Sequence, residues 1–570
     1  DVAPSRGLGD VYKRQEYMKT KYLAILLCAA FVLPGCNDSF LDRIPLDELT
    51  DETYWETEEH LILASNACIN YLRGKSRSVD MEFLGDNVFR ERSSEYKTLG
   101  SGNFTSDLSV INSEWTTDYD GIRRCNHFLE NYERAQKVSA SVRERYAGEA
   151  IFIRAYLYSY LVNCFGDVPR VTNTIDVGDD ELYGSRTDKE TMIEWILDEF
   201  DRAAAVLPYA KDLKDSELGR PTKEAAWAFS SRFALYHERW DKAVSSAEEV
   251  MTAGFHKLYD NGNPETTYNE LFTLAANPVT NKNNREFIVT RLYSEEANQT
   301  HNLSRELQVP NEEARYAPTR SLMDAYLCNG LPITLPASRY RENTHEAIFN
   351  NRDPRMAQTI LKPGAKWGGY PGKTTYEQPK FSNSATSCRT TTGWYFTKFV
   401  ELSAISRYNK DQNAIPLMRY AEVLLNWIEA KEMRGDAITQ PDIDKSINLL
   451  RDRVGADKMV LTKLNAYGLN LRDEIRRERR VELALEGERY FDLLRWKQGD
   501  LLAKDVTGMR KSTVPPSEYV YVEDIPTDDK GNLILMTGRT FSDMKNYLWP
   551  IPFTQTQRNP NLLPNNPGWE

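Results

Sequence analysis

Two stretches of the chain repeat one pattern, and this repeat limits the fold more than any other feature. In the first stretch, an apolar helical run at 224–238 is followed by a second run that begins at 240–247. In the other, a run at 418–433 is followed by one at 443–450. Both predict a helix, a short turn and a second helix. Because one such pair cannot bury its apolar face alone, the sequence predicts a scaffold of stacked helix pairs.

The second helix of each predicted pair begins in the same way. A large residue is followed by Asp and Lys, then by a small and a β-branched residue, as from Trp240 to Val244. This order is similar to the second half of a tetratricopeptide unit, where the small side chain lets the paired helices approach closely. Two looser pairs, 143–162 with 190–207 and 472–485 with 488–497, complete the set. We expect a mainly α fold in which four tetratricopeptide-like helix pairs form a right-handed helical scaffold.

The segment 254–416 separates the second predicted pair from the third and shows little helical periodicity. It is rich in Asn, Thr, Pro and Gly, which favour turns and loops. We expect an irregular, loop-rich lobe with few short strands, inserted between the second and third pairs. Since loops held by a rigid frame often carry function, the sequence predicts a binding site in this lobe, with the loop-rich stretch 70–113 as a second wall.

The composition excludes several partners. The 570 residues are 41% hydrophobic and 27% charged, as in an ordinary globular protein with a large core. The formal net charge of -12 gives no footprint for nucleic acid, whose phosphates need clustered Lys and Arg. The seven cysteines lack the close spacing of a zinc site or a redox pair. We expect no nucleic-acid partner, no metal and no cofactor.

The N-terminal region has the pattern of an export signal. A short basic stretch that begins at Met18 precedes an apolar run at 22–33. That run is too short to cross a bilayer as a helix, so it predicts a signal peptide over 18–35. A small glycine directly before Cys36 resembles a lipobox, and we expect the Cys36 thiol to carry lipid after cleavage.

Residues 1–17 precede this complete signal. They place charged residues ahead of a signal that begins at its own Met18, and Asp10-Val11-Tyr12-Lys13-Arg14-Gln15 reads like a translated sequencing adapter. We therefore expect a non-native leader, and a mature chain that spans 36–570.

Motifs of common enzyme classes are missing from the sequence. There is no phosphate-binding loop, no nucleophile elbow and no dinucleotide fingerprint. His237 and His345 are each followed by Glu, as in a zinc protease, but Asp241 and Phe349 stand where the second His is needed. We expect a binding protein rather than an enzyme.

Four segments carry distinctive motifs. They are Cys36-Asn37-Asp38-Ser39-Phe40-Leu41-Asp42, Ile415-Pro416-Leu417-Met418-Arg419-Tyr420, Glu478-Arg479-Arg480-Val481-Glu482 with Arg489-Tyr490-Phe491-Asp492-Leu493-Leu494-Arg495-Trp496, and Pro550-Ile551-Pro552 with Asn566-Pro567-Gly568-Trp569. Together they resemble the SusD/RagB family of outer-membrane nutrient-binding lipoproteins from Bacteroidetes-type bacteria. The likeness spans 36–570, with an N-terminal part at about 36–215 and a C-terminal part at about 255–570.

The resemblance implies more than the residue patterns do. It implies four tetratricopeptide-like units that carry a loop-rich ligand lobe. It also implies lipid anchoring at the outer face of the outer membrane, and service as a lid on a SusC-like TonB-dependent transporter in polysaccharide utilisation. Members of this family mostly bind oligosaccharides, so we expect a glycan-binding protein without chemistry of its own.

Sugar recognition needs an aromatic face against the pyranose ring and planar polar groups for adjacent hydroxyls. Trp367-Gly368-Gly369-Tyr370 places two aromatic residues in a glycine-loosened loop, where a ring can stand exposed. The N-terminal loops offer polar and stacking partners. The candidate glycan contacts are Asp86, Asn87, Arg90, Asn103, Phe104, Trp367 and Tyr370.

Two other patterns have a structural interpretation. The charges from Arg472 to Arg480 are expected to pair along one helix, with Glu474, Glu478 and Glu482 three or four positions from Arg. A helical stripe is expected to belong to the core; its members are Trp115, Tyr119, Ile122 and Asn126.

Two alternative functions stay open from sequence alone. Helical repeats are general protein-binding frames, so a surface scaffold that recognises peptides or proteins is the first alternative. A surface glycosidase is the second, because its carboxylate pair is defined by spatial separation rather than by a motif.

Overall fold

The computed structural model describes residues 54–309, 313–369, 373–382 and 388–569. The chain divides into two compact units, Asp1–Glu56 and Thr57–Glu570, and nearly all described residues belong to the second. The expected leader, the signal peptide, the lipidation site Cys36 and the candidate contact Tyr370 lie outside the described residues. In the part of the chain that the structure describes, no helix is long and apolar enough to cross a membrane.

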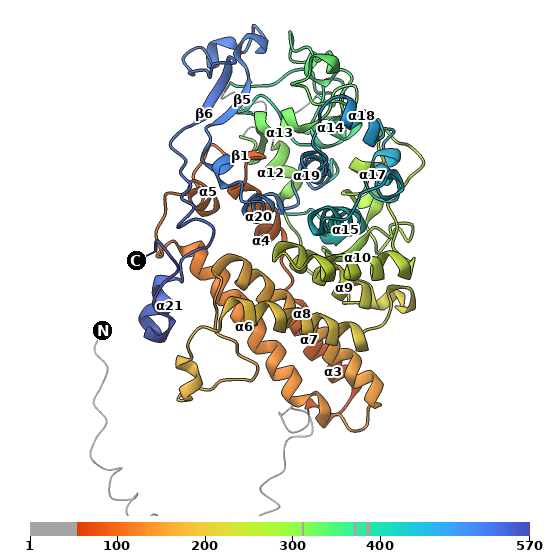
Figure 1. The fold of residues 1–570 in the computed structure, drawn as a ribbon, viewed down its shortest axis with the longest axis vertical. Helices are drawn as coiled ribbons and strands as arrows, with labels where there is room; N and C mark the ends of the chain where they lie inside the picture. Colours follow the sequence, from red (N-terminus) through yellow and green to blue (C-terminus); the bar gives the residue numbers. More distant parts are fainter. Residues whose placement is uncertain (1–53, 310–312, 370–372, 383–387, 570) are drawn as a thin grey trace, which may run out of the picture. The chain divides into compact units, whose positions relative to one another are not determined.

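Helix pairs build the scaffold, as the sequence predicts (Figure 1). Neighbouring helices pack in the order α7, α8, α9, α10 and α15, and α15 also contacts α19. Their bounds are α7 (Ala140–Phe165), α8 (Lys189–Val206), α9 (Lys223–Tyr236), α10 (Trp240–Ala253), α15 (Tyr420–Arg434), α16 (Gln440–Asp444), α17 (Ile447–Arg453), α19 (Leu471–Glu482) and α20 (Arg489–Arg495). The expected mainly α architecture is confirmed.

Two helices outside the repeat pattern cover α7. They are α3 (Glu58–Ile69) and α6 (Ser109–Asn131), and both pack against it. α7 is therefore buried around almost its whole circumference, as its spread of apolar residues predicts. Its buried Arg154 is satisfied, because Nε donates to Glu199 at 2.9 Å and Nη1 donates to Asn126 at 2.9 Å.

Small side chains let α9 and α10 approach closely. Ala243 of α10 is fully buried. The hydroxyl oxygens of Ser230 and Ser246 lie 3.1 Å apart across the pair, and Ser231 Oγ donates to the Ala243 carbonyl at 2.9 Å. Gly254, at φ 69°, ends α10 in the left-handed conformation that favours glycine. The pair has the close contact expected of a tetratricopeptide-like unit.

The second helix of the third pair is broken, and the prediction of one continuous helix over 443–450 is wrong. α16 ends at Asp444 and α17 begins at Ile447. Between them, Ser446 Oγ donates to the Asp442 carbonyl at 2.7 Å. A continuous helix would pair that carbonyl with the Ser446 amide, so the side chain competes with the helical hydrogen bond.

The segment 254–416 forms the expected loop-rich lobe with short elements. β2 pairs antiparallel with β4, which leads directly into α15 and so ties the lobe to the scaffold. The elements of this segment and its exit are α11 (Thr267–Glu270), β2 (Phe287–Arg291), α12 (Leu303–Gln308), β3 (Ala317–Pro318), α13 (Arg320–Ala325), α14 (Pro354–Thr359) and β4 (Ile415–Arg419).

Short strands also bring the N-terminal loops and the C-terminal segment against the rest. β1 pairs antiparallel with β3 of the lobe, and β5 pairs with β6. The remaining elements are α4 (Lys75–Ser78), β1 (Val88–Phe89), α5 (Glu95–Gly100), α18 (Leu461–Ala466), β5 (Val506–Arg510), β6 (Asn532–Met536) and α21 (Phe553–Arg558). The stretch 70–113 thus lies beside the lobe.

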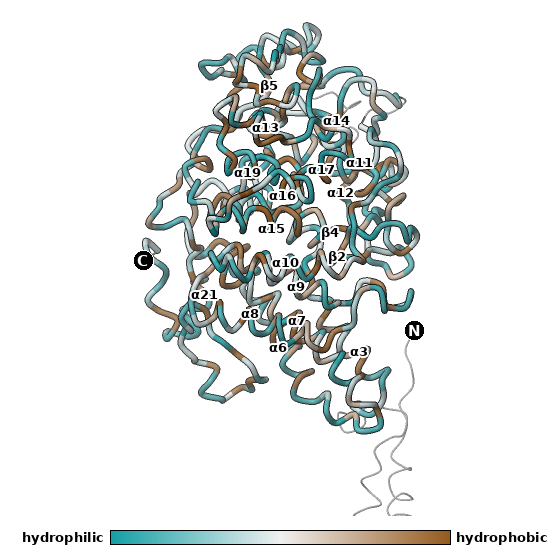
Figure 2. Tube along the Cα trace, turned by 45° about the vertical axis from the view of Figure 1, so that its right-hand side comes forward, coloured by the Kyte–Doolittle hydropathy of each residue, from teal (hydrophilic) through white to brown (hydrophobic). Residues whose placement is uncertain are grey.

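Buried charges hold the lobe against α19. Arg419, at the end of β4, forms ion pairs with Glu286 at 2.8 Å, with Glu482 at 2.8 Å and with Glu486 at 2.7 Å. Figure 2 shows the neighbouring α15 as largely hydrophobic and α19 as largely hydrophilic. α19 contributes buried carboxylates to such ion pairs beside its buried Ile475 and Val481, and these pairs are costly to break once they are buried.

Candidate functional site

A cleft of about 640 Å³ opens between α6, the loop that joins α7 to α8, and the C-terminal segment around α21. We call it the aromatic cleft. Its lining includes Trp115, Tyr119, Arg123, Asn173, Tyr183 and Gln555. The volume lies within the range of about 300–1,000 Å³ that small-molecule sites occupy.

Aromatic rings form one wall of the cleft. Trp115 is 5% exposed and fixed in the core, and its ring centroid lies 5.1 Å from that of Tyr119. The Tyr119 hydroxyl donates to the Pro169 carbonyl at 2.8 Å, which fixes the tyrosine ring. Tyr183 is 51% exposed, and its carbonyl accepts from the Asn561 amide at 2.7 Å. The cleft thus offers an exposed ring on an anchored main chain, which suits stacking on a sugar.

Planar polar side chains form the rest of the lining. Asn173 Nδ2 donates to Glu181 at 2.8 Å, and Gln555 Nε2 donates to Asn112 at 2.9 Å. Arg123 pairs with Asp176 at 3.3 Å near the protein surface. Amide and guanidinium groups offer two coplanar bonding sites each, so they suit the adjacent hydroxyls of a sugar ring.

The stripe Trp115, Tyr119, Ile122 and Asn126, expected as core, has a double role. Ile122 and Asn126 are buried, and Asn126 Nδ2 donates to the Val171 carbonyl at 3.1 Å. Three of the four residues nevertheless line the aromatic cleft. The sequence pattern shows which residues share a face, but it does not show which part of that face another loop leaves open.

Asp86 and Asn87, two of the predicted contacts, are buried inside an ion network. Asp86 pairs with Arg480 at 3.0 Å and with Arg489 at 2.7 Å. Burial alone would raise the pKa of Asp86, but the two arginines hold it well below its usual range. Asn87 Oδ1 accepts from Arg480 Nε at 2.8 Å.

The other predicted contacts lie at separate places. Arg90 is half-buried over the Phe83 ring at 5.9 Å. Asn103 Nδ2 donates to the Gly538 carbonyl at 2.9 Å, and Phe104 packs on Trp569 with centroids 4.7 Å apart. These contacts join the N-terminal loop to the C-terminal segment.

The expectation that a ring stands exposed in the 367–370 loop is wrong for Trp367. Its side chain is 4% exposed, and its ring lies 5.4 Å from Tyr376 and 5.6 Å from Tyr395. These rings form a small satellite core of the lobe with Cys388 and Val309. The two glycines that suggested a loose loop instead make room for packing, since a Cβ at Gly369 would lie 2.5 Å from the Trp367 indole nitrogen.

The two predicted walls, which β1 and β3 already join, also meet at a cluster of ion pairs that we call the loop junction. Arg389 of the lobe forms ion pairs with Glu91 of the N-terminal loop and with Glu313, the latter at 3.3 Å. Arg92 reaches Glu313 at 3.7 Å. Arg90 is the one predicted contact directly adjacent in sequence to this cluster, so the structure does not gather the predicted set there.

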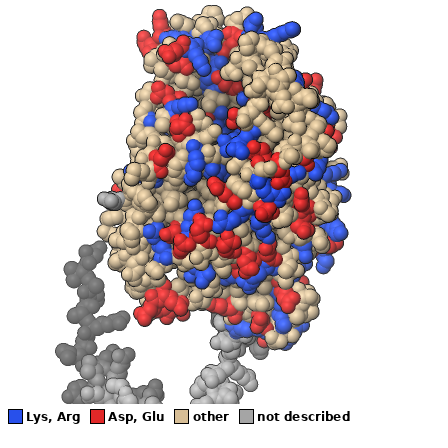
Figure 3. Space-filling model, viewed as in Figure 1, with Lys and Arg blue, Asp and Glu red and all other residues tan. Residues whose placement is uncertain are grey.

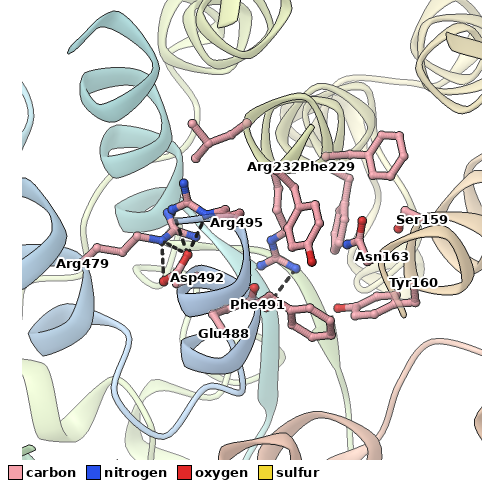
Figure 4. A pocket seen from close by; sticks show the side chains of 13 residues that line it. Ser159, Tyr160, Asn163, Phe229, Arg232, Arg479, Glu488, Phe491, Asp492 and Arg495 are labelled. Atoms are coloured by element: carbon pink, nitrogen blue, oxygen red, sulfur yellow. Dashed lines mark hydrogen bonds and ion pairs between the residues drawn. The ribbon is translucent and has the colours of Figure 1, made fainter. Parts of the chain in front are cut away.

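A second cavity lies inside the scaffold, where α7 and α9 meet α20 (Figure 4). Its volume is about 20 Å³, which is room for about one water. Arg232 points to Glu488 at 3.2 Å within it. Burial raises the pKa of Glu488 to about 7. This cavity is too small for a sugar and belongs to the packing of the scaffold.

Within the described ranges, no group of three or more His, Cys, Asp or Glu side chains could hold a metal ion. The five described cysteines are buried.

Comparison with known protein families assigns the chain to a family. The family model described as the SusD family matches residues 285–569, which is half of the chain. The chain belongs to the SusD family. A second model of this kind, described as starch-binding and associating with the outer membrane, matches residues 39–235.

Individual SusD-like proteins resemble the chain over most of its length. SusD-like protein P2 of Formosa agariphila is 24% identical, with 96% of this chain and 100% of that protein covered. A SusD-like carbohydrate-binding protein of Bacteroides fragilis has a TM-score of 0.78 at 27% identity, with 90% of this chain and all of that chain covered. Surface glycan-binding protein A of Bacteroides fluxus shares the fold at a TM-score of 0.62 and 19% identity, with 90% of this chain and 100% of that one covered.

Proposed function

We propose that this SusD-family chain is a cell-surface protein that captures oligosaccharides and delivers them to a partner TonB-dependent outer-membrane transporter. It does so without cleaving them, and it is held at the outer membrane by lipid on Cys36. The aromatic cleft is the single observation that carries the ligand class. It combines an exposed ring at Tyr183 with planar amides and a guanidinium in a volume suited to a short oligosaccharide.

Two further observations support the proposed function. The similar Bacteroides fragilis protein is described as carbohydrate-binding, and the N-terminal family model is described as starch-binding and associated with the outer membrane. Delivery to a transporter and the lipid anchor follow from the family resemblance and the lipobox-like Cys36. The predicted contacts Asp86, Asn87, Arg90, Asn103, Phe104, Trp367 and Tyr370 remain a second proposal for the contact surface.

A glycan screen followed by titration calorimetry tests the proposal. We expect Tyr183→Ala to weaken the binding of a neutral oligosaccharide about tenfold, because about 1.4 kcal/mol of stacking is lost. Tyr183→Phe keeps the ring and should bind nearly as well as the wild type. Tyr519→Ala removes another exposed tyrosine, 41% accessible and outside the cleft, and serves as the matched control.

Arg389→Ala at the loop junction decides between the two surfaces. Loss of binding in this variant, with Tyr183→Ala unaffected, would move the site to the junction.

Retention of peptides with no glycan bound would instead favour the protein-binding scaffold. Release of shorter sugars during the titration would identify a glycosidase and contradict capture without cleavage.

A further inference from the structure

Another pocket, distinct from both the aromatic cleft and the small cavity inside the scaffold, opens beside α19. Its volume is about 380 Å³, and it lies between α13, the segment 332–334, α19 and the region around α20. We call it the arginine pocket. Four guanidinium groups line it, from Arg476, Arg477, Arg480 and Arg489. Figure 3 shows Lys and Arg side chains gathered on the face where α19 and α20 lie.

These four arginines have few carboxylates between them. Arg480 and Arg489 share the single carboxylate of Asp86, at 3.0 and 2.7 Å. Arg477 pairs with Glu474 at 3.2 Å. Two aspartates also line the pocket, but the carboxylate of Asp324 is held by Arg320 at 2.8 Å, outside the lining. The other, Asp473, is exposed on α19.

Arg476 shows most clearly that the arginines of the pocket lack carboxylate partners. Among the described residues, no hydrogen bond or ion pair joins its guanidinium to another side chain or to the main chain. Its Nε atom is buried without a partner, and its guanidinium carbon lies 4.9 Å from the centre of the Trp496 ring. The ring supports one face of the guanidinium and leaves its edge for hydrogen bonds to a ligand.

The surrounding electrostatics agree with this geometry. Burial, together with Arg489 and Arg477 nearby, lowers the pKa of Arg480 to about 10. Burial also lowers the pKa of Arg476. On the opposite side of α19 the pKa shift has the other sign. Acidic partners raise the pKa of Arg355 and Arg419 above the usual range in spite of burial. The four arginines of the lining outnumber its two aspartates, so a bound anion would offset positive charge in the pocket.

We propose that the arginine pocket binds an oxyanion, the carboxylate or sulfate group of a small ligand. Guanidinium forks bond such groups through paired N–H donors, which a point charge such as lysine does not reproduce. Trp496, Pro332 and Ile333 add apolar wall, and 380 Å³ falls within the range of small-molecule pockets. The ligand class is therefore an acidic monosaccharide or a comparable small acid. This inference rests on the pocket alone and is independent of neutral-glycan binding in the aromatic cleft.

Calorimetry and thermal shift on the whole chain test the proposal with four probes. They are glucuronate, glucose 6-sulfate, inorganic sulfate and neutral glucose, each at the same ionic strength set with sodium chloride. We expect the anionic probes to bind and glucose not to bind. Tighter binding of glucuronate or glucose 6-sulfate than of sulfate would assign an acidic sugar, and sulfate alone would assign a free oxyanion.

Variants show whether the arginine fork is responsible. We expect Arg476→Ala to weaken binding of the tightest anionic probe about tenfold or more, and Arg476→Lys to restore only part of it, because charge returns without the fork. Arg472→Ala removes an equal charge from the same helix outside the pocket, where the side chain pairs with Glu432 at 2.8 Å, and should leave binding unchanged.

Three results would overturn the proposal. They are absence of binding by every anionic probe, equal binding of glucose, and equal losses in Arg472→Ala and Arg476→Ala. None of them would affect the Tyr183 test of the aromatic cleft, so the two proposals fail separately.

Discussion

The two faces of α19 carry similar residues and have different roles. On the inner face, Glu478 pairs with Arg355 at 2.6 Å and with Arg451 at 2.8 Å, and Glu482 pairs with Arg355 and Arg419. On the outer face, arginines outnumber their acidic partners and line a pocket. The difference comes from the elements that pack on each side. Arg355, Arg419 and Arg451, all from outside α19, reach the inner face. A charged helix therefore acquires its role from its neighbours.

The comparison also corrects the sequence interpretation of this helix. Pairing three or four residues apart was expected for Glu474, Glu478 and Glu482. Among them, only Glu474 shows such a pair among the described residues, with Arg477 at 3.2 Å. The other two are buried, where their carboxylates meet arginines from distant segments. A spacing of three or four residues predicts ion pairs on an exposed helix. When the helix is buried, contacts with other elements decide which arginine pairs with each carboxylate.

The largest expected effect comes from breaking the inner face. Arg419→Met should lower the free energy of unfolding by about 3–5 kcal/mol, because it removes at once the ion pairs that Arg419 forms with Glu286, Glu482 and Glu486 in the core. Denaturant unfolding followed by circular dichroism measures it. A loss below about 1 kcal/mol would show that the inner ion pairs do not hold the fold.

A buried acid without an ion pair sharpens the comparison. Glu82 accepts from the Gly487 amide at 2.9 Å and forms no ion pair among the described residues, and burial raises its pKa to about 7. The unfolded chain loses this proton near pH 4.5, so Glu82 lowers stability progressively between about pH 4.5 and 7.

Glu82→Gln should therefore match the wild type at pH 4.5 and exceed it at pH 8 by roughly 2–3 kcal/mol. Melting temperatures of both proteins across this pH range check the difference. A constant offset at all pH values would mean that Glu82 is ionised in the native state like the acids of the inner face.

The smallest expected effect is on the outer face. Arg476→Ala should change the free energy of unfolding by less than about 0.5 kcal/mol, because the arginine lacks a carboxylate partner among the described residues. The same denaturant experiment measures it beside Arg419→Met. Equal losses for both variants would erase the distinction between the two faces.

Helix pairs could be predicted from sequence because their signal is local. The predicted run 143–162 became α7 (Ala140–Phe165), and 190–207 became α8 (Lys189–Val206). Apolar periodicity and capping residues such as Asp188, which accepts from the Thr191 amide, fix such helices without reference to the rest of the chain.

The candidate site could not be predicted in the same way. Trp367 lies in a glycine-rich loop that suggests exposure, yet Tyr376 and Tyr395 enclose it. Tyr183 carries no motif, and it is exposed in the cleft because the loop between α7 and α8 meets the C-terminal segment there. Exposure depends on contacts between residues far apart in the sequence, which periodicity does not encode.

The most direct test of glycan capture is a crystal structure with a bound oligosaccharide that the screen identifies. The account predicts an intact sugar in the aromatic cleft, with one ring stacked on Tyr183 and hydroxyls near Asn173 or Gln555. A sugar bound elsewhere, with the cleft empty, would contradict the assigned site, and a cleaved sugar would contradict capture without chemistry.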